Sequence, residues 1–324
     1  MTPVLGMRPN APTVFLSSYK SAISYLSSNS ANTNTSVFYG LYIQEDFSVK
    51  QSFADKLKTY YNVEVHKFSN SKKAAEDINT AVAETTNNLI NDIVSEKDLE
   101  KAELVLVSAL YFKAAWLNQF SAVDSKPKDF LTSRGYKKVQ MMSLKGEYLP
   151  YIKIAGKFDA ISLTYKDTDY SMIALRPLSQ SMSAVQTMLN ALSSVDLAQL
   201  TSDMRTTRCN VQMPRFEIRK KYLNLKSVFQ SMGVKRVFSD KSDLSGMAFE
   251  PLKIDKIILE VFMNVTEAGT EAAAAAVILI TTTITSWRPP PPKPLNFHLD
   301  RPFVAVVWNS KHNMSLFEAY VGSP

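Results

Sequence analysis

The sequence lacks most of the features that identify an enzyme or a metal protein. It has one cysteine, Cys209, and three histidines, His66, His298 and His312. No serine lies in a G-x-S-x-G motif, and neither H-E-x-x-H nor G-x-x-x-x-G-K occurs, so no metal site or phosphate-binding loop is indicated. A catalytic nucleophile also needs a base within hydrogen-bond reach, and the sequence marks none. We therefore expect structural histidines and predict no catalytic residue, metal or cofactor.

Long stretches of one residue type are scarce as well. The net charge is +7, but no five like charges are consecutive, so we expect no nucleic-acid partner. The longest apolar run, Ala272 to Ile280, is too short to cross a bilayer, and we expect no membrane partner. The start, "MTPVLGMRPNAP", lacks the pattern of a signal peptide. A single cysteine cannot form an internal disulfide, so the compartment stays open between secretion, which we favour, and the cytoplasm.

The remaining pattern alternates between helix and strand. Helical periodicity predicts helices over residues 15–28, 48–61, 74–94 and 222–233. β-branched and aromatic runs predict strands over residues 36–44, 63–68, 103–116, 138–142, 158–165, 171–177, 209–218 and 256–265. The segment "RPFVAVVWNSKHNMSLFEAYVG" predicts a hairpin with its turn at Asn309 to Asn313. The chain of 324 residues is long enough for a large core, and we predict one α+β domain over residues 1–324.

One stretch near the end resembles a known functional segment. "NVTEAGTEAAAAAV", residues 264–277, resembles the hinge of the serpin reactive-centre loop. "LVLVSALYFKAAW", which ends at Trp116, resembles the serpin strand that ends in the breach tryptophan, and the C-terminal hairpin segment also follows in serpin order. The match extends from about Val14 to Pro324. It implies a large central mixed β-sheet with flanking helices, further sheets and an exposed reactive-centre loop at about residues 267–296.

The resemblance also implies a function and its residues. Serpins are suicide-substrate inhibitors: a protease cuts the loop, forms an acyl-enzyme, and is held there while the cut loop inserts into the main sheet as a new strand. This chain would then be an inhibitor and not an enzyme. The hinge residues carried over are Glu267, Gly269, Thr270, Glu271, Ala272, Ala273, Ala274 and Ala275, and the breach residue is Trp116.

The composition of the stretch suits insertion into a sheet. A strand that becomes buried needs uncharged side chains on its inward positions. Counting by twos from Thr270, these positions are Ala272, Ala274, Ala276, Ile278, Ile280 and Thr282. Glu271 lies on the opposite, solvent-facing parity, and Gly269 gives the backbone freedom to turn into the sheet.

The resemblance implies the position of the reactive bond less sharply. The family's usual spacing from Glu267 places the cut after Thr283, before Ile284, whereas counting back from the other end of the loop places it near Arg288. A proline follows Arg288, so we favour Thr283–Ile284, with Ile280 and Arg288 as alternatives. Apolar and small residues around Thr283 favour an elastase-like serine protease as partner, with a chymotrypsin-like or a cysteine protease as alternatives.

Three departures from the family pattern lead to alternative predictions. Nothing before Val14 resembles the opening helices of a serpin, so we expect those helices to be lacking. Ser108 and Leu259-Glu260-Val261 replace residues of the family's polar shutter. Together these departures favour the alternative of a non-inhibitory serpin-fold protein.

Two further segments bear on possible binding partners. The helix predicted at residues 15–28 carries only Lys20 as a basic residue, so we expect no heparin binding through it. The segment "RPPPPKP" fits a polyproline ligand of SH3-type domains, which leaves a polyproline-presenting interaction protein as a further alternative.

Overall fold

The computed structural model describes residues 12–26, 33–270 and 292–324. The chain divides into two compact units. The first unit comprises residues 1–29, 34–112 and 218–263, and the second comprises residues 30–33, 113–217 and 264–324. The prediction of one domain over residues 1–324 stays a prediction.

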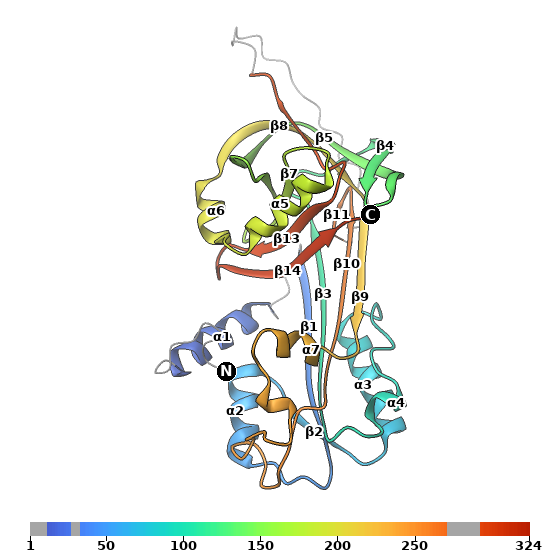
Figure 1. Ribbon diagram of the computed structural model, residues 1–324, viewed down its shortest axis with the longest axis vertical. Helices are drawn as coiled ribbons and strands as arrows, with labels where there is room; N and C mark the ends of the chain where they lie inside the picture. Colours follow the sequence, from blue (N-terminus) through green and yellow to red (C-terminus); the bar gives the residue numbers. More distant parts are fainter. Residues whose placement is uncertain (1–11, 27–32, 271–291) are drawn as a thin grey trace. The chain divides into compact units, whose positions relative to one another are not determined.

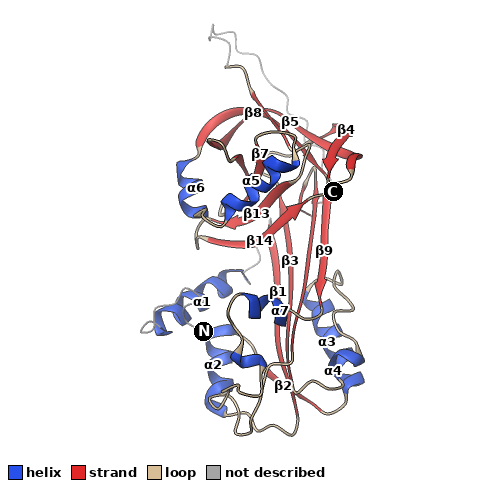
Figure 2. Cartoon of the chain, in the orientation of Figure 1, coloured by secondary structure: helices blue, strands red, loops and turns tan. Residues whose placement is uncertain are grey.

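The described residues form two β-sheets with flanking helices, which confirms the α+β class and the large mixed sheet (Figures 1 and 2). One sheet has the strand order β2-β1-β3-β11-β10-β9. Its strands are β1 (Thr33–Gln44), β2 (Val65–Phe68), β3 (Leu104–Ala115), β9 (Phe216–Tyr222), β10 (Lys256–Thr266) and β11 (Gly269–Thr270). β3 and β10 pair in parallel, whereas β11 is antiparallel to both.

The second sheet has the strand order β12-β8-β5-β6-β7-β13-β14, and β4 pairs with β5 beside this path. Its strands are β4 (Ser121–Thr132), β5 (Gly135–Ile154), β6 (Phe158–Thr164), β7 (Tyr170–Pro177), β8 (Arg205–Pro214), β12 (Leu295–His298), β13 (Phe303–Asn309) and β14 (Met314–Val321). The helices are α1 (Pro12–Leu26), α2 (Gln51–Tyr61), α3 (Ser71–Thr85), α4 (Glu96–Leu99), α5 (Met182–Leu192), α6 (Leu197–Asp203) and α7 (Lys226–Ser231). No helix in the described ranges has the length and apolar character needed to cross a membrane.

Each unit has its own hydrophobic core. In the first unit, Ile78 and Val82 of α3 are fully buried in one cluster with Val105 and Val107 of β3. In the second unit, helices α5 and α6 pack with β6, β7 and β13 around a cluster that includes Phe158. α3 buries residues at a helical spacing, and its capping residue Asn70 accepts a hydrogen bond from the Lys73 backbone N–H at 2.9 Å, which fixes its start.

Several predicted elements are confirmed, and three are corrected. The C-terminal hairpin forms with its turn between β13 and β14. The helix predicted over 74–94 ends at Thr85, because Asn87 and Asn88 adopt left-handed conformations with φ of 53° and 60°, which no α-helix accommodates. The helix predicted over 222–233 is only α7, which Gly233 follows at φ 98°. The strand predicted over 209–218 is two strands, β8 and β9, which lie in different sheets.

Candidate functional site at the two ends of the loop

The site begins where β3 ends, at Trp116. Its side chain is 1% exposed and stacks on Tyr165, with ring centroids 4.3 Å apart and an angle of 8° between the rings. The indole N–H donates to the Thr266 carbonyl at 2.9 Å, and the Trp116 backbone N–H donates to the Ala268 carbonyl at 3.0 Å. Trp116 therefore holds the chain on both sides of Glu267, in the segment that leads from β10 to β11.

Glu267 lies in a polar contact within this otherwise apolar region. Its carboxylate accepts two hydrogen bonds from Nε of Arg215, at 2.8 and 2.7 Å, and one from the Ser125 hydroxyl at 2.5 Å. The side chain of Glu267 is 10% exposed and that of Arg215 is 48% exposed. Burial by itself would raise the pKa of Glu267, but the hydrogen bonds from Arg215 and Ser125 outweigh it and lower the pKa below its ordinary range. Glu267 is thus a buried, ionised and fully partnered carboxylate at the hinge.

Gly269 allows the chain to turn into the sheet. Its φ is 150°, and a Cβ atom at this position would lie 2.2 Å from the Ala114 carbonyl oxygen and 2.6 Å from Cα of Ala115. Both neighbours are backbone, so neither can move aside as a flexible side chain would. Only glycine fits here without displacing β11 from β3.

Thr270 follows in β11 and is fully buried. Its backbone pairs with Ala114 of β3 and with Val265 of β10. Its hydroxyl lies 3.0 Å from the Tyr165 hydroxyl, which gives both buried polar groups a partner. Thr270 therefore occupies an inward position between two strands of the sheet.

Most of the other predicted loop residues lie outside the described residues. These are Glu271 and the alanines Ala272 to Ala275, together with the candidate reactive-bond residues Ile280, Thr283, Ile284 and Arg288. Their assignments stay predictions.

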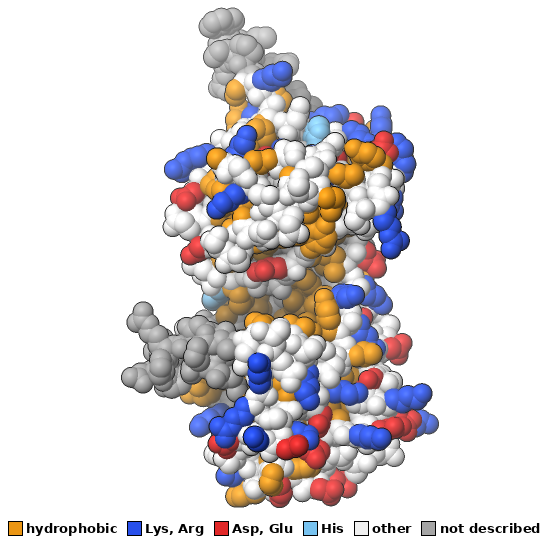
Figure 3. Space-filling view, in the orientation of Figure 1, with side chains coloured by type: hydrophobic (Ala, Val, Ile, Leu, Met, Phe, Trp, Pro, Cys, Tyr) orange, Lys and Arg blue, Asp and Glu red, His pale blue; other side chains and the backbone are white. Residues whose placement is uncertain are grey.

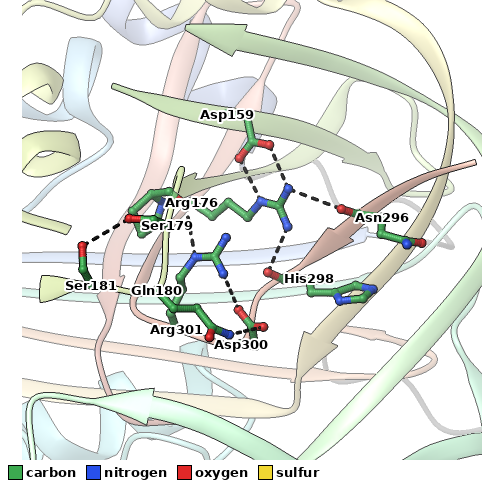
Figure 4. A network of polar contacts seen from close by, with 10 residues as sticks. Asp159, Arg176, Ser179, Gln180, Ser181, Asn296, His298, Asp300 and Arg301 are labelled. Carbon is green, nitrogen blue, oxygen red and sulfur yellow. Dashed lines mark hydrogen bonds and ion pairs between the residues drawn. The ribbon is translucent and has the colours of Figure 1, made fainter. Parts of the chain in front are cut away.

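Beyond the loop, the chain is anchored again at β12, and Arg176 of β7 makes the main contacts (Figure 4). Its guanidinium forms two parallel bonds to the Asp159 carboxylate, at 2.8 and 2.9 Å. The same group donates to the backbone carbonyls of His298 and Asn296, at 3.1 and 3.4 Å, and lies 4.1 Å from the centre of the Phe297 ring. One arginine thus contacts three consecutive residues of β12, on a side where none of the described strands pairs with β12.

β12 pairs with β8 beside Cys209. The register places Leu295 opposite Cys209, and the cysteine is fully buried. Burial raises the pKa of its thiol to about 11, against a small lowering by Arg176. The thiol is therefore protonated and unreactive in the folded chain.

The three histidines lie in three different environments. His66 stacks on Tyr42 with ring centroids 5.0 Å apart, and His312 lies in the turn between β13 and β14. Burial lowers the pKa of His298, helped by nearby cations and opposed by Asp300. No group of three or more His, Cys, Asp or Glu side chains that could hold a metal ion occurs among the residues described.

The altered shutter positions lie on neighbouring strands. Leu259 of β10 pairs with Ser108 of β3, and Glu260 pairs with Ala109. Glu260 is 6% exposed, and burial raises its pKa, with Lys221 and Arg219 opposing the rise. This sheet region therefore carries a buried carboxyl group.

Three residues of the site have no marker in the sequence. Ser125, Tyr165 and Arg215 lie 142, 105 and 52 positions from their partners in the hinge. Only the fold brings them to Glu267 and Thr270.

The whole chain matches one protein family. The family model described as Serpin (serine protease inhibitor) covers residues 1–324. The chain therefore belongs to the serpin family, as its hinge motif indicated. The family is one of protease inhibitors, which is consistent with the expectation that this chain is not an enzyme.

Its relatives include both sequences and solved structures. Serpin B3 of Homo sapiens is 30% identical over 292 residues, which is 88% of this chain and 73% of that protein. Iris of Ixodes ricinus is 30% identical over 284 residues, 86% of this chain and 74% of that protein. Serpin48 of Tenebrio molitor, described as highly specific, superposes with a TM-score of 0.84 at 26% identity over 99% of this chain and 84% of that one. Thyroxine-binding globulin in complex with thyroxine shares the fold, with a TM-score of 0.83 at 20% identity over 99% of this chain and 85% of that one.

We predict that Gly269→Ala displaces β11. The added methyl group cannot coexist with the Ala114 carbonyl, and a positive φ costs a non-glycine residue about 1–2 kcal/mol. Backbone amides of residues 269–270 should exchange hydrogen faster by tenfold or more. Gly246→Ala is the control, because its Cβ would meet open space and should leave the hinge amides unchanged. Unchanged exchange at Thr270 in Gly269→Ala would contradict this account.

We predict that Glu267→Gln lowers stability at neutral pH and not in acid. The pKa of Glu267 in the folded state lies below its ordinary 4.5, so its stabilisation is fully present above that value and is lost as the pH falls through the folded-state pKa. The variant should lose about 1–3 kcal/mol at pH 7, measured by denaturant unfolding. The difference from wild type should shrink below pH 4.5. A difference that stays constant down to pH 3 would show that the carboxylate charge is not what stabilises the hinge.

We predict that Arg176→Met loosens β12. The substitution keeps much of the side-chain volume but leaves Asp159 buried without its ion pair, which costs about 3–5 kcal/mol. Amides of Leu295 to His298 should exchange faster, while those of β14 should not change. Arg205→Met removes an exposed arginine from the same sheet and is the control. Adding Asp159→Asn to Arg176→Met should recover part of the loss; no recovery would mean that the buried charge is not its cause.

Proposed function

We propose that the chain is a suicide-substrate inhibitor of serine proteases, in which a cut loop inserts between β3 and β10. The observation that carries the proposal is the position of β11. Thr270 already pairs with both strands and is fully buried, so a new central strand has begun at the hinge.

The strand register indicates what insertion would require. β3 and β10 pair directly over Val105–Tyr111 and Lys256–Phe262. Continued in the register of Thr270 opposite Ala114, an inserting chain would separate these pairs and bond to both strands. One parallel pairing would be replaced by two antiparallel pairings, which are slightly more stable per residue. This exchange supplies a driving force for insertion.

The same register supports the choice of reactive bond. Each residue added after Thr270 moves one position back along β3 from Ala114, so residue 280 would lie opposite Leu104, where β3 begins. A cut after Thr283 leaves enough chain to fill this length. We propose Thr283–Ile284 as the reactive bond and an elastase-like serine protease as the target.

A second candidate is a serpin-fold protein that does not inhibit. The observation that favours it is Glu260, a buried carboxyl group on β10, whose charged form is costly in the sheet interior. A sheet that does not open would leave the cut loop outside, and the chain would be an ordinary substrate.

The two candidates separate on one denaturing gel. We expect the wild type to form an SDS-stable complex with an elastase-like protease, within a panel that also contains chymotrypsin-like and trypsin-like enzymes. Thr270→Arg should abolish the complex and be cut instead, because the inward position beside Tyr165 cannot accept an unpaired charge without a cost of several kcal/mol. Slow insertion lets the acyl-enzyme hydrolyse.

Ala273→Arg is the matched control, because it adds the same charge on the opposite parity. It should keep most of the complex. Clean cleavage of the wild type by every protease, without complex, would leave the non-inhibitory candidate. Full complex formation by Thr270→Arg would show that Thr270 is not on the inserting face.

A further inference from the structure

The β4–β5 hairpin accounts for more than half of the net positive charge of the chain. Residues 121–145 contain five lysines and one arginine against two aspartates, which gives 6 − 2 = +4 of the chain's +7. Lys and Arg side chains gather on the surface where Figure 1 labels β4 (Figure 3). The charges are not consecutive in the sequence, and antiparallel pairing of the two strands brings them together.

Only part of this charge is neutralised within the hairpin. Lys138 pairs with Asp129 at 3.0 Å, and Lys145 pairs with Asp124 at 2.9 Å. Lys137 donates to the Pro324 carbonyl at 2.6 Å. The three others, Lys126, Lys128 and Arg134, are exposed and form no ion pair with any residue in the described ranges.

Exposed apolar side chains stand among these cations. Tyr136 is 65% exposed, and it lies two positions from Arg134 and two from Lys138. Val123 is 88% exposed. Tyrosine and arginine are enriched at the centres of protein–protein interfaces. Binding of a linear polyanion, in contrast, would require only the cations.

The hairpin is joined to the hinge. The Ser125 hydroxyl of β4 donates to Glu267, and the Phe120 backbone N–H, directly before β4, donates to the Glu267 carbonyl at 3.0 Å. Val123 lies between these two contacts in the sequence. A protein bound to the start of the hairpin therefore lies beside the base of the reactive loop.

Protection of a sheet edge explains the patch only in part. Among the described strands, β4 pairs only with β5, and Lys126, Pro127 and Lys128 are residues that discourage pairing of an open edge with another chain. This role does not require the cations at the turn and on β5, nor an exposed tyrosine among them.

We propose that the β4–β5 hairpin is a docking surface for an acidic face of the target protease, separate from the reactive bond. The proposal rests on the proposed inhibitory function for its partner. Charge complementarity raises the rate of encounter and selects among proteases that cut the same sequence. Tyr136 and Val123 supply the apolar contact within the charged surface.

The test uses the full chain and two elastase-like proteases, one acidic and one basic. The variant Lys126→Glu/Lys128→Glu/Arg134→Glu reverses the three unpaired cations. Its control, Lys56→Glu/Lys72→Glu/Lys101→Glu, makes the same change in net charge on exposed lysines of the first unit. The second-order rate of loop cleavage and the yield of SDS-stable complex are measured separately, from about 0.05 M to about 1 M salt, because screening shortens the reach of charges over this range.

We expect the hairpin variant to react with the acidic protease at least about tenfold more slowly than wild type at low salt, and the gap to close at high salt. The control variant and the basic protease should show much smaller changes. The complex yield per cleavage should not change, because the hairpin acts before the cut. Tyr136→Ala should slow the reaction at every salt concentration.

Equal slowing by the hairpin and control variants would overturn the proposal, since net charge alone would then explain it. Unchanged protease rates combined with hairpin-dependent retention on immobilised dextran sulfate would also overturn it, in favour of a polyanion site. Cleavage without complex would remove the inhibitory function, but a hairpin-dependent and salt-dependent cleavage rate would still support the docking surface.

Discussion

The arrangement of the site depends on the absence of a Cβ atom at Gly269. The backbone of β11 approaches β3 so closely at this point that a Cβ atom would overlap the Ala114 carbonyl. Because the chain can enter the sheet at this point, Thr270 reaches a buried position, where its hydroxyl contacts that of Tyr165. Tyr165 in turn supports the ring of Trp116, which holds the preceding turn by two hydrogen bonds. The close approach at Gly269 thus places Thr270 against Tyr165 and, through Tyr165, next to Trp116.

Ion pairs with buried carboxylates secure the chain on both sides of the loop. Glu267 and Arg215 hold the hinge, and Asp159 and Arg176 hold β12. Such pairs are costly to remove from water, and a hydrophobic pair of equal volume can be as stable. Their advantage here is geometric: each arginine fixes a carboxylate or a backbone segment in one orientation. The segments before and after residues 271–291 are therefore each held at a defined point.

Local sequence explains why the hinge and most strands were predictable. The hinge residues are nearly consecutive, and the uncharged inward positions from Thr270 onward can be read from the sequence itself. The C-terminal hairpin was predictable for the same reason, since its strands and turn are contiguous. By contrast, β4 was missed because "SAVDSKPKDFLT" has few apolar residues in alternation. An edge strand needs less apolar surface than a central one and more protection against pairing.

The contacts that complete the site could not be predicted, because they join distant segments. The apolar pattern continues across Arg215 and predicts one strand there. The chain instead passes from one sheet to the other at this residue, and only this change brings Arg215 to Glu267. The basic hairpin was missed for a related reason. Apart from Lys145, its cations lie in two short groups at residues 126–128 and 134–138, and neither group forms a charge cluster until antiparallel pairing brings the two together.

The burial of Cys209 gives the molecule an internal chemical reporter. The cysteine lies on β8 opposite Leu295 of β12, the strand that follows the loop, and it is fully buried. An alkylating reagent can therefore reach the sulfur only in molecules in which the structure around Cys209 has opened. The alkylation rate would measure how often this opening occurs, in the unmodified chain and without any added label.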